Sequence, residues 1–246
     1  MQDGLTSLLA GLESSSTTHM TTSDQRVARL SVVDSQRNSI DGLIEQEFYH
    51  WKNGKTEAQQ QEIWEGYYAM FNHILPQVID SLHPSVSYWE SSPKFGRGNP
   101  KHQFEGDAHY WGVWHDAEPF ENLEVKVPRF MSEFGFQSFP EISTIATFSD
   151  SADWSLNSDV MKSHQKHPRG NALIKEYMQR EYNVPEKFEK FVYASQILQA
   201  EGMRIGLEAH RRSQPYCMGT LYWQLNDCWP VASWSSRDYF GNWKAL

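Results

Sequence analysis

The sequence predicts an α/β fold. Four short apolar runs are separated by helical or irregular connections, a pattern that favours parallel strands joined by crossovers. Each run ends in aromatic or ionisable side chains, and a TIM (β/α)8 barrel collects its chemistry at the carboxyl ends of its strands. The pattern therefore indicates part of such a barrel, with four strands rather than eight and no internal repeat.

The composition of the chain argues against several classes of function. The chain has 246 residues, of which 39% are hydrophobic, enough for one sizeable core. A net charge of -9 without a run of Lys and Arg argues against nonspecific nucleic-acid binding. No stretch approaches the roughly 18 apolar residues that a membrane-spanning helix needs. Residues 1–4 lack the basic region of a secretion signal, so we expect no export signal in this chain. Compartment and oligomeric state are not specified.

The residue types favour a sugar-binding site over a metal site. Cys217 and Cys228 have no metal-ligand spacing, and His164 and His167 flank a loop with too few further ligands. We therefore expect no metal and no organic cofactor. Aromatic residues make up 14% of the chain, including 10 Trp. Such rings fill cores, and they also form flat platforms that suit the C–H faces of sugars.

The amino-terminal region differs from the rest. Residues 1–40 are rich in Ser and Thr and have too little apolar content to offset the entropy of ordering, so we expect this segment to be poorly ordered. Residues 41–246 form the predicted barrel portion. There, apolar residues three and four apart predict a helix over 56–82, with Thr56 as its N-cap. A short strand is predicted at 85–89.

The remaining elements lead to the candidate site. Aromatic residues predict a strand over 108–114, and a second strand ends at Glu133. Helices are predicted over 172–182 and after Pro185, and the last strand precedes Asp227. The basic residues of 208–212 are interpreted as a helix cap, favourable at the negative end of the helix dipole.

Glu133 closes an apolar run just before a glycine, where a barrel enzyme holds a rigid carboxylate. Glycoside hydrolysis uses two carboxyl groups, which stand roughly 5 to 5.5 Å apart in retaining enzymes. Glu133 is the nucleophile candidate, and a surface glutamate before a turn is the alternative. About ninety residues later the run 219–230 brings Trp223 and further polar groups to a second strand end.

Four segments together resemble the β-mannosidases of glycoside hydrolase family 2, namely residues 106–114, 128–140, 206–212 and 216–230. The resemblance implies a TIM barrel, Glu133 as nucleophile at the end of strand seven, and Trp223 lining the subsite of the nonreducing mannose at strand eight. It implies a retaining exo-β-mannosidase that acts on β-mannoside oligosaccharides. Related β-galactosidases and β-glucuronidases share the shorter motifs and remain an alternative.

The general acid/base is not matched. Family members carry it in an Asn-Asn-Glu motif about eight residues before the tryptophan that corresponds to Trp51, and counting back reaches Leu43. Glu45 and Glu47 would lie beyond the strand end. The resemblance therefore covers barrel strands five to eight with their helices, and we expect this chain alone to be inactive or nearly so. A noncatalytic carbohydrate-binding or partner-binding protein is the alternative from another class.

Other candidates are weighed from their positions. His109 is predicted to bind substrate or tune the nucleophile, or else to be a satisfied strand-end histidine. Trp111 and Trp114 should face opposite sides of a strand, with Trp111 the better pocket candidate. Asp227 either binds a sugar hydroxyl or stabilises a turn. Trp51 contributes to the sugar site by its family position.

Overall fold

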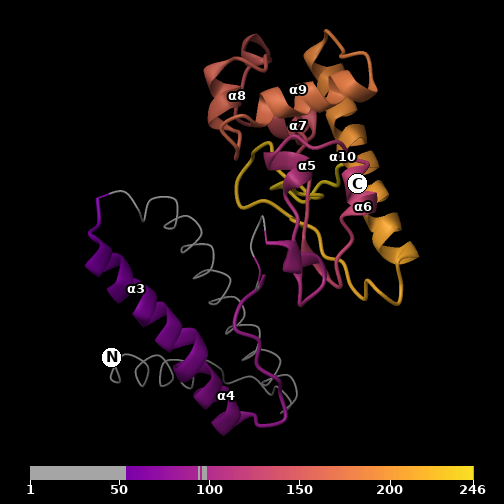
Figure 1. Cartoon of the computed structure of the whole chain (residues 1–246). Coiled ribbons are helices and arrows are strands. Elements are labelled where there is room, and N and C mark those ends of the chain that lie inside the picture. The colour runs from indigo at the N-terminus through magenta and orange to yellow at the C-terminus, as the bar shows by residue number, and fades with distance from the viewer. Residues whose placement is uncertain (1–53, 94, 96–98, 246) are drawn as a thin grey trace, which may run out of the picture. The chain divides into compact units, whose positions relative to one another are not determined.

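The computed structural model describes residues 54–93, 95 and 99–245. The chain divides into two compact units, residues 1–91 and 92–246, and each is described by itself (Figure 1). The predictions for residues 1–40, Leu43, Glu45, Glu47 and Trp51 lie outside the described part. Among the described residues, no helix combines the length and the apolar character needed to cross a membrane.

The first unit contains a helical rod formed by α3 (Glu57–Ala69), a π-helical segment (Met70–Ile74) and α4 (Leu75–Leu82). Thr56 caps α3: its hydroxyl accepts the Gln59 N–H, and the Gln59 side chain accepts the Thr56 N–H. This reciprocal pair is a capping box. The predicted helix and its N-cap are confirmed.

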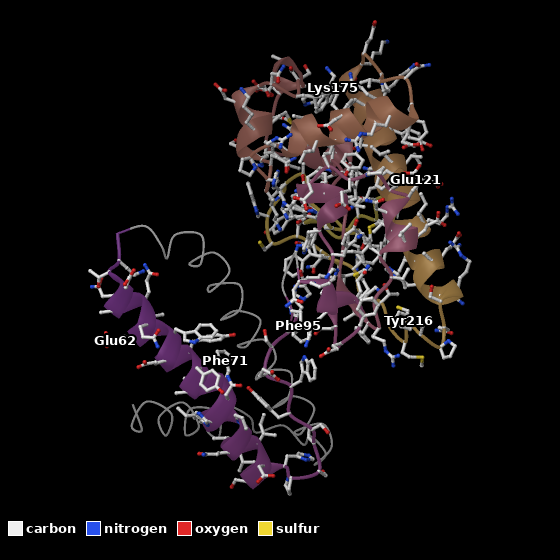
Figure 2. All side chains as sticks on the ribbon, viewed as in Figure 1. Glu62, Phe71, Phe95, Glu121, Lys175 and Tyr216 are labelled. Atoms are coloured by element: carbon white, nitrogen blue, oxygen red, sulfur yellow. The ribbon has the colours of Figure 1, made fainter. Side chains whose placement is uncertain are left out.

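The rod changes its hydrogen-bond pattern ahead of Pro76. Proline has no N–H to donate, so a regular α-helical bond to the carbonyl four residues earlier cannot form there. The Leu75 N–H instead bonds the Met70 carbonyl, five residues earlier, which is the π pattern. Within residues 57–82 only Phe71 is buried, and Glu62 and Phe71 project from different sides of the rod (Figure 2).

The predicted strand at 85–89 is wrong. The chain turns there, with the Val86 N–H bonded to the His83 carbonyl at 3.0 Å. The Tyr88 hydroxyl then donates to the Phe71 carbonyl at 2.6 Å. The segment therefore packs back on the rod through the side chain of Tyr88.

Three parallel segments form the centre of the second unit. Strand β1 (Ala108–His109) pairs in parallel with β2 (Met131–Glu133). On its other edge β2 pairs with residues 218–223: the Met131 N–H donates to Gly219 at 3.0 Å and the Leu221 N–H donates to Met131 at 2.7 Å. The predicted parallel arrangement is confirmed for these segments. The described residues show no barrel closure.

The predicted strand over 108–114 is too long. It ends at His109, and residues Gly112–His115 form the helical turn α5. The turn is closed by the Glu118 N–H, which bonds the Gly112 carbonyl at 3.0 Å. It carries Trp114 into the core, where the side chain is fully buried.

Helices surround these segments. Helices α9 (Gly170–Glu181) and α10 (Phe188–Arg212) confirm the two predicted after Glu133. Shorter helices are α6 (Asn122–Val125), α7 (Ile142–Ile145) and α8 (Asp159–Ser163), with 3-10 turns at Pro100–Gln103 and Ser151–Asp153. Figure 1 shows α7, α8 and α9 gathered at one end of this unit and α10 running along it.

The core of the second unit is aromatic. Phe136 contacts the rings of Trp114, Phe120 and Tyr177 at centroid distances of 4.8 to 5.0 Å. Helix α10 also contributes buried polar side chains to this core. The Gln199 amide donates to the Phe136 carbonyl at 2.7 Å and accepts the Ser138 hydroxyl at 2.6 Å. The chain after β2 is thus fixed to α10 by both apolar packing and hydrogen bonds.

We predict that Gly202→Ala destabilises the second unit. Alanine favours a helix by about 1 kcal/mol over glycine, but here its Cβ would lie 2.3 Å from the Phe120 ring. Overpacking of this kind costs about 1 to 3 kcal/mol. Gly66→Ala in α3, where nothing lies within 4 Å, is the matched control and should slow exchange in its helix. Hydrogen exchange measured peptide by peptide gives the amide exchange rates of α3 and α10 separately. Unchanged exchange in α10 of Gly202→Ala would contradict the packing.

We predict that His210 makes the stability of the second unit depend on pH. Its side chain is buried against Phe134 and Thr220, and burial lowers its pKa to about 4. The unfolded chain, with a histidine pKa near 6.5, binds the proton first on acidification. Stability from this group is therefore complete above about pH 6.5 and falls towards pH 4, by at most about 1.4 kcal/mol per pH unit. Residues 208–212 are interpreted from the sequence as a basic helix cap. His210 does not contribute a positive charge to such a cap, because its imidazole is neutral at pH 7.

Urea unfolding at pH 7 and pH 5 checks this expectation. His210→Asn keeps a short polar side chain that does not titrate, so its stability should fall less on acidification than that of the wild-type chain. Equal losses in the two proteins would show that His210 does not titrate in this window.

Candidate active site

The candidate site lies at the carboxyl end of β2. Glu133 is its last residue, and its side chain is 27% exposed. Two neighbours from the β1 region point at the same carboxylate oxygen, Oε2. The indole Nε1 of Trp111 donates to it at 3.2 Å, and Nδ1 of His109 lies 3.4 Å from it. The parallel register brings these three residues together, because His109 is the β1 partner of Glu133.

His109 is a neutral hydrogen-bond donor at pH 7. Burial lowers its pKa to about 4, although the nearby Asp107 carboxylate acts in the opposite direction. A neutral imidazole carries one N–H. Nε2 lies 4.0 Å from Asp107, beyond hydrogen-bond distance, whereas Nδ1 lies closer to Glu133. We therefore infer that the proton is on Nδ1, which faces Oε2 of Glu133 at 3.4 Å.

Asp107 fixes the start of β1. Its Oδ2 accepts hydrogen bonds from the hydroxyls of Ser92 and Ser132, each at 2.5 Å. Ser132 belongs to β2 and Asp107 directly precedes β1, so this bond joins the two strands beside their backbone pairing. This geometry gives Asp107 a structural role.

Gly135 brings the strand that carries Trp223 close to β2. A Cβ on Gly135 would lie 2.2 Å from the Trp223 carbonyl and 3.3 Å from both Trp111 and Trp234. The Trp223 N–H donates to the Phe134 carbonyl at 2.9 Å, and the Trp223–Gln224 peptide bond is cis. The backbone of Trp223 is thus fixed one residue beyond Glu133, while its side chain is 44% exposed.

The surroundings of Asp227 are those of a carboxylate that stabilises the fold. Its carboxylate is fully buried; Oδ1 accepts Lys166 Nζ at 3.0 Å, and Oδ2 accepts the hydroxyls of Ser233 at 2.7 Å and Ser235 at 2.5 Å. These hydrogen bonds from Lys166, Ser233 and Ser235 hold the carboxylate inward. Of the two alternatives for Asp227, the geometry matches the stabilised turn rather than the sugar contact.

The prediction that Trp111 and Trp114 face opposite sides of a strand is wrong, because the strand ends at His109 and both indoles contact Trp234. Trp114 is buried in the core, and Trp111 lies beside the carboxylate. His115 and Trp234 contact Trp111, and His167 contacts those two residues, without any sequence pattern that indicates this grouping. His167 and Trp234 come from irregular segments, where no periodicity marks a shared face.

The arrangement suits a rigid, directional carboxylate. The indole N–H of Trp111 bonds Oε2, and the neutral imidazole of His109 lies 3.4 Å from the same oxygen, so both groups help to orient Glu133. Preorganised donors of this kind position a nucleophile or bind a polar ligand. Within the described residues, no group of three His, Cys, Asp or Glu side chains is placed to hold a metal ion.

Comparison with known proteins identifies relatives of this chain, although no family model matches it. Beta-mannosidase B of Emericella nidulans is 36% identical over 177 residues, which are 70% of this chain and 21% of that protein. Beta-mannosidase B of Aspergillus flavus is 37% identical over 177 residues, with the same coverage. The chain thus spans about a fifth of the length of the curated relatives it matches.

A solved structure gives the same result. The crystal structure of the β-D-mannosidase from Dictyoglomus thermophilum superposes with a TM-score of 0.68 at 36% identity, covering 72% of this chain and 22% of that one. Sequence and fold agree over most of the chain, which is therefore a β-mannosidase-like segment of glycoside hydrolase family 2.

Proposed function

We propose that this chain is the nucleophile-bearing part of a retaining exo-β-mannosidase that removes terminal β-linked mannose from oligosaccharides. The observation that carries the proposal is the Glu133 carboxylate at a parallel strand end, with Trp111 and His109 at 3.2 and 3.4 Å from Oε2. The names of the relatives support the substrate class. A TIM barrel, of which these parallel segments would be neighbouring strands, is part of the same proposal.

In the proposed reaction Glu133 attacks the anomeric carbon of the mannoside. The bond from that carbon to the leaving oxygen breaks, and the leaving oxygen takes a proton from a general acid. An ester then joins Glu133 to mannose. One carboxylate oxygen of Glu133 forms the bond to the anomeric carbon, and the other becomes the carbonyl oxygen of that ester. Water releases mannose in the second step and restores the carboxylate.

Trp223 supplies the proposed platform for the bound mannose. Its backbone is fixed beside Phe134 while much of its indole remains exposed. An exposed indole face suits the C–H groups of a pyranose. Trp51 is proposed to contribute by its family position alone.

A second candidate is carbohydrate binding without turnover. The other carboxylate near Glu133 is Asp107, and its Oδ2 already accepts two serine hydroxyls at 2.5 Å. That environment suits a structural ion better than a proton donor, so the acid/base stays unassigned. A sugar whose leaving group departs without protonation distinguishes the two candidate functions. It should react with the nucleophile of a mannosidase, whereas a binding protein should leave it unreacted.

We predict that 2-deoxy-2-fluoro-β-mannosyl fluoride labels Glu133. Fluoride leaves without help from a general acid, and the fluorine at C2 slows hydrolysis of the ester. Mass spectrometry of the intact chain should show one added fluoromannosyl group, and peptide mapping should place it on Glu133. Glu133→Gln should abolish labelling, whereas Glu121→Gln, at an exposed position, should leave it intact. No labelling of the wild-type chain would favour binding without turnover.

Trp111→Phe tests the indole donor. Phenylalanine keeps an aromatic ring but loses the N–H that bonds Glu133, and a hydrogen bond to a charged group contributes about 1.5 to 3 kcal/mol. The rate of labelling should fall by about tenfold or more. Trp154→Phe is the matched control, because it removes an indole bond to Ser149 elsewhere in the unit. Equal labelling rates for Trp111→Phe and wild type would show that the donor does not position Glu133.

A further inference from the structure

Trp234 packs against the indole that bonds Glu133. The rings of Trp234 and Trp111 meet edge to face, with 6.0 Å between their centroids and 74° between their planes. Trp111 in turn donates its indole N–H to Oε2 of Glu133 at 3.2 Å. Trp234 therefore supports the side chain that orients the carboxylate.

The backbone after β2 also limits the room around the Trp111 indole. A Cβ built on Gly135 would lie 3.3 Å from Cη2 of Trp111 and 3.3 Å from Cδ1 of Trp234, so both indoles lie against the chain two residues beyond Glu133. Close packing of this kind leaves a side chain few alternative rotamers. Trp111 is thus bounded by Gly135 and by Trp234 while its N–H meets the carboxylate.

The backbone around Trp234 is fixed to the chain that continues β2. The Ser138 N–H donates to the Ser233 carbonyl at 3.0 Å, and the Ser233 N–H donates back to the Ser138 carbonyl at 3.2 Å. The Trp234 carbonyl accepts the Gln224 N–H at 3.2 Å and the Gln199 amide at 3.1 Å. The indole of Trp234 therefore projects from a backbone that is held on both sides.

Packing, rather than a hydrogen bond, holds the Trp234 ring. It contacts the fully buried ring of Trp114 at a centroid distance of 5.9 Å, in addition to Trp111. Its Nε1 is buried and has no hydrogen-bond partner among the described residues. Phenylalanine at this position would therefore keep an aromatic contact and lose no hydrogen bond, whereas leucine would lose the aromatic contact.

We propose that Trp234 is a positioning residue, which holds the Trp111 indole so that its N–H meets Oε2 of Glu133. The inference rests on the proposed function, because a carboxylate that attacks a carbon atom must be held in the right orientation. In this proposal the effect of Trp234 on the reaction passes through Trp111.

The rate at which 2-deoxy-2-fluoro-β-mannosyl fluoride labels Glu133 tests this role in the full chain. Trp234→Leu should slow labelling about three- to tenfold, and Trp234→Phe should restore most of the rate. In a Trp111→Phe background, Trp234→Leu should slow labelling by less than about twofold more, because the N–H through which it acts is already absent. Trp154→Leu, which removes another partly buried indole of the unit, should label at the wild-type rate.

Proton–nitrogen NMR of the indole N–H groups gives a second readout that needs no turnover. The Trp111 signal is identified by its absence in Trp111→Phe. In Trp234→Leu it should shift towards the position that it has in Glu133→Gln, where the charged acceptor is gone. It should keep its wild-type position in Trp234→Phe and in Trp154→Leu. Wild-type amide exchange in α10 shows that each variant is folded.

A wild-type labelling rate in folded Trp234→Leu, equal slowing by leucine and phenylalanine, or an undiminished further loss in the Trp111→Phe background would overturn the proposal. If Trp234→Leu loosens α10, Trp234→Phe decides, and a shifted Trp111 signal in that variant would overturn the proposal. If the wild-type chain is not labelled, the catalytic function fails. The positioning role then fails separately if the Trp111 signal is the same in Trp234→Leu and wild type.

Discussion

The candidate site depends on the backbone pairing of β2 on both of its edges. Met131 donates to the segment 218–223 and accepts from it, while β1 pairs along the opposite edge. Parallel pairing places the carboxyl ends of all three segments at one edge of the sheet. His109, Glu133 and Trp223 therefore converge, although Trp223 lies far from the other two along the chain.

Helix α10 keeps that pairing in place. Gln199 is fully buried, and its amide bonds the carbonyls of Phe136, Trp234 and Ser235, so one side chain joins the continuation of β2 to the last part of the chain. Gly206 on the same helix lets Phe134 approach closely, since a Cβ there would meet its ring at 2.6 Å. Packing behind the strand thus fixes the residue that follows Glu133.

Sequence patterns predicted the elements that have a local signal. Thr56 and the periodicity after it marked a helix and its cap, and the apolar run before Glu133 marked a strand. The strand at 85–89 failed because the chain turns at Val86 and Tyr88 bonds the Phe71 carbonyl, contacts that the local sequence does not reveal. The inward turn of Asp227 depends on its contacts with Lys166, Ser233 and Ser235, which come from residues up to 61 positions away. Trp234 likewise meets Trp111 only through the tertiary fold.

The central physical claim is that His109 is neutral and carries its proton on Nδ1, the nitrogen that faces the Glu133 carboxylate at 3.4 Å. Nitrogen NMR of the imidazole in the full chain measures its charge and tautomer directly. The structure predicts a neutral ring at pH 7, protonated at Nδ1, with a proton signal that shifts in Glu133→Gln. An imidazolium at pH 7, or a neutral ring protonated at Nε2, would contradict this account of the site.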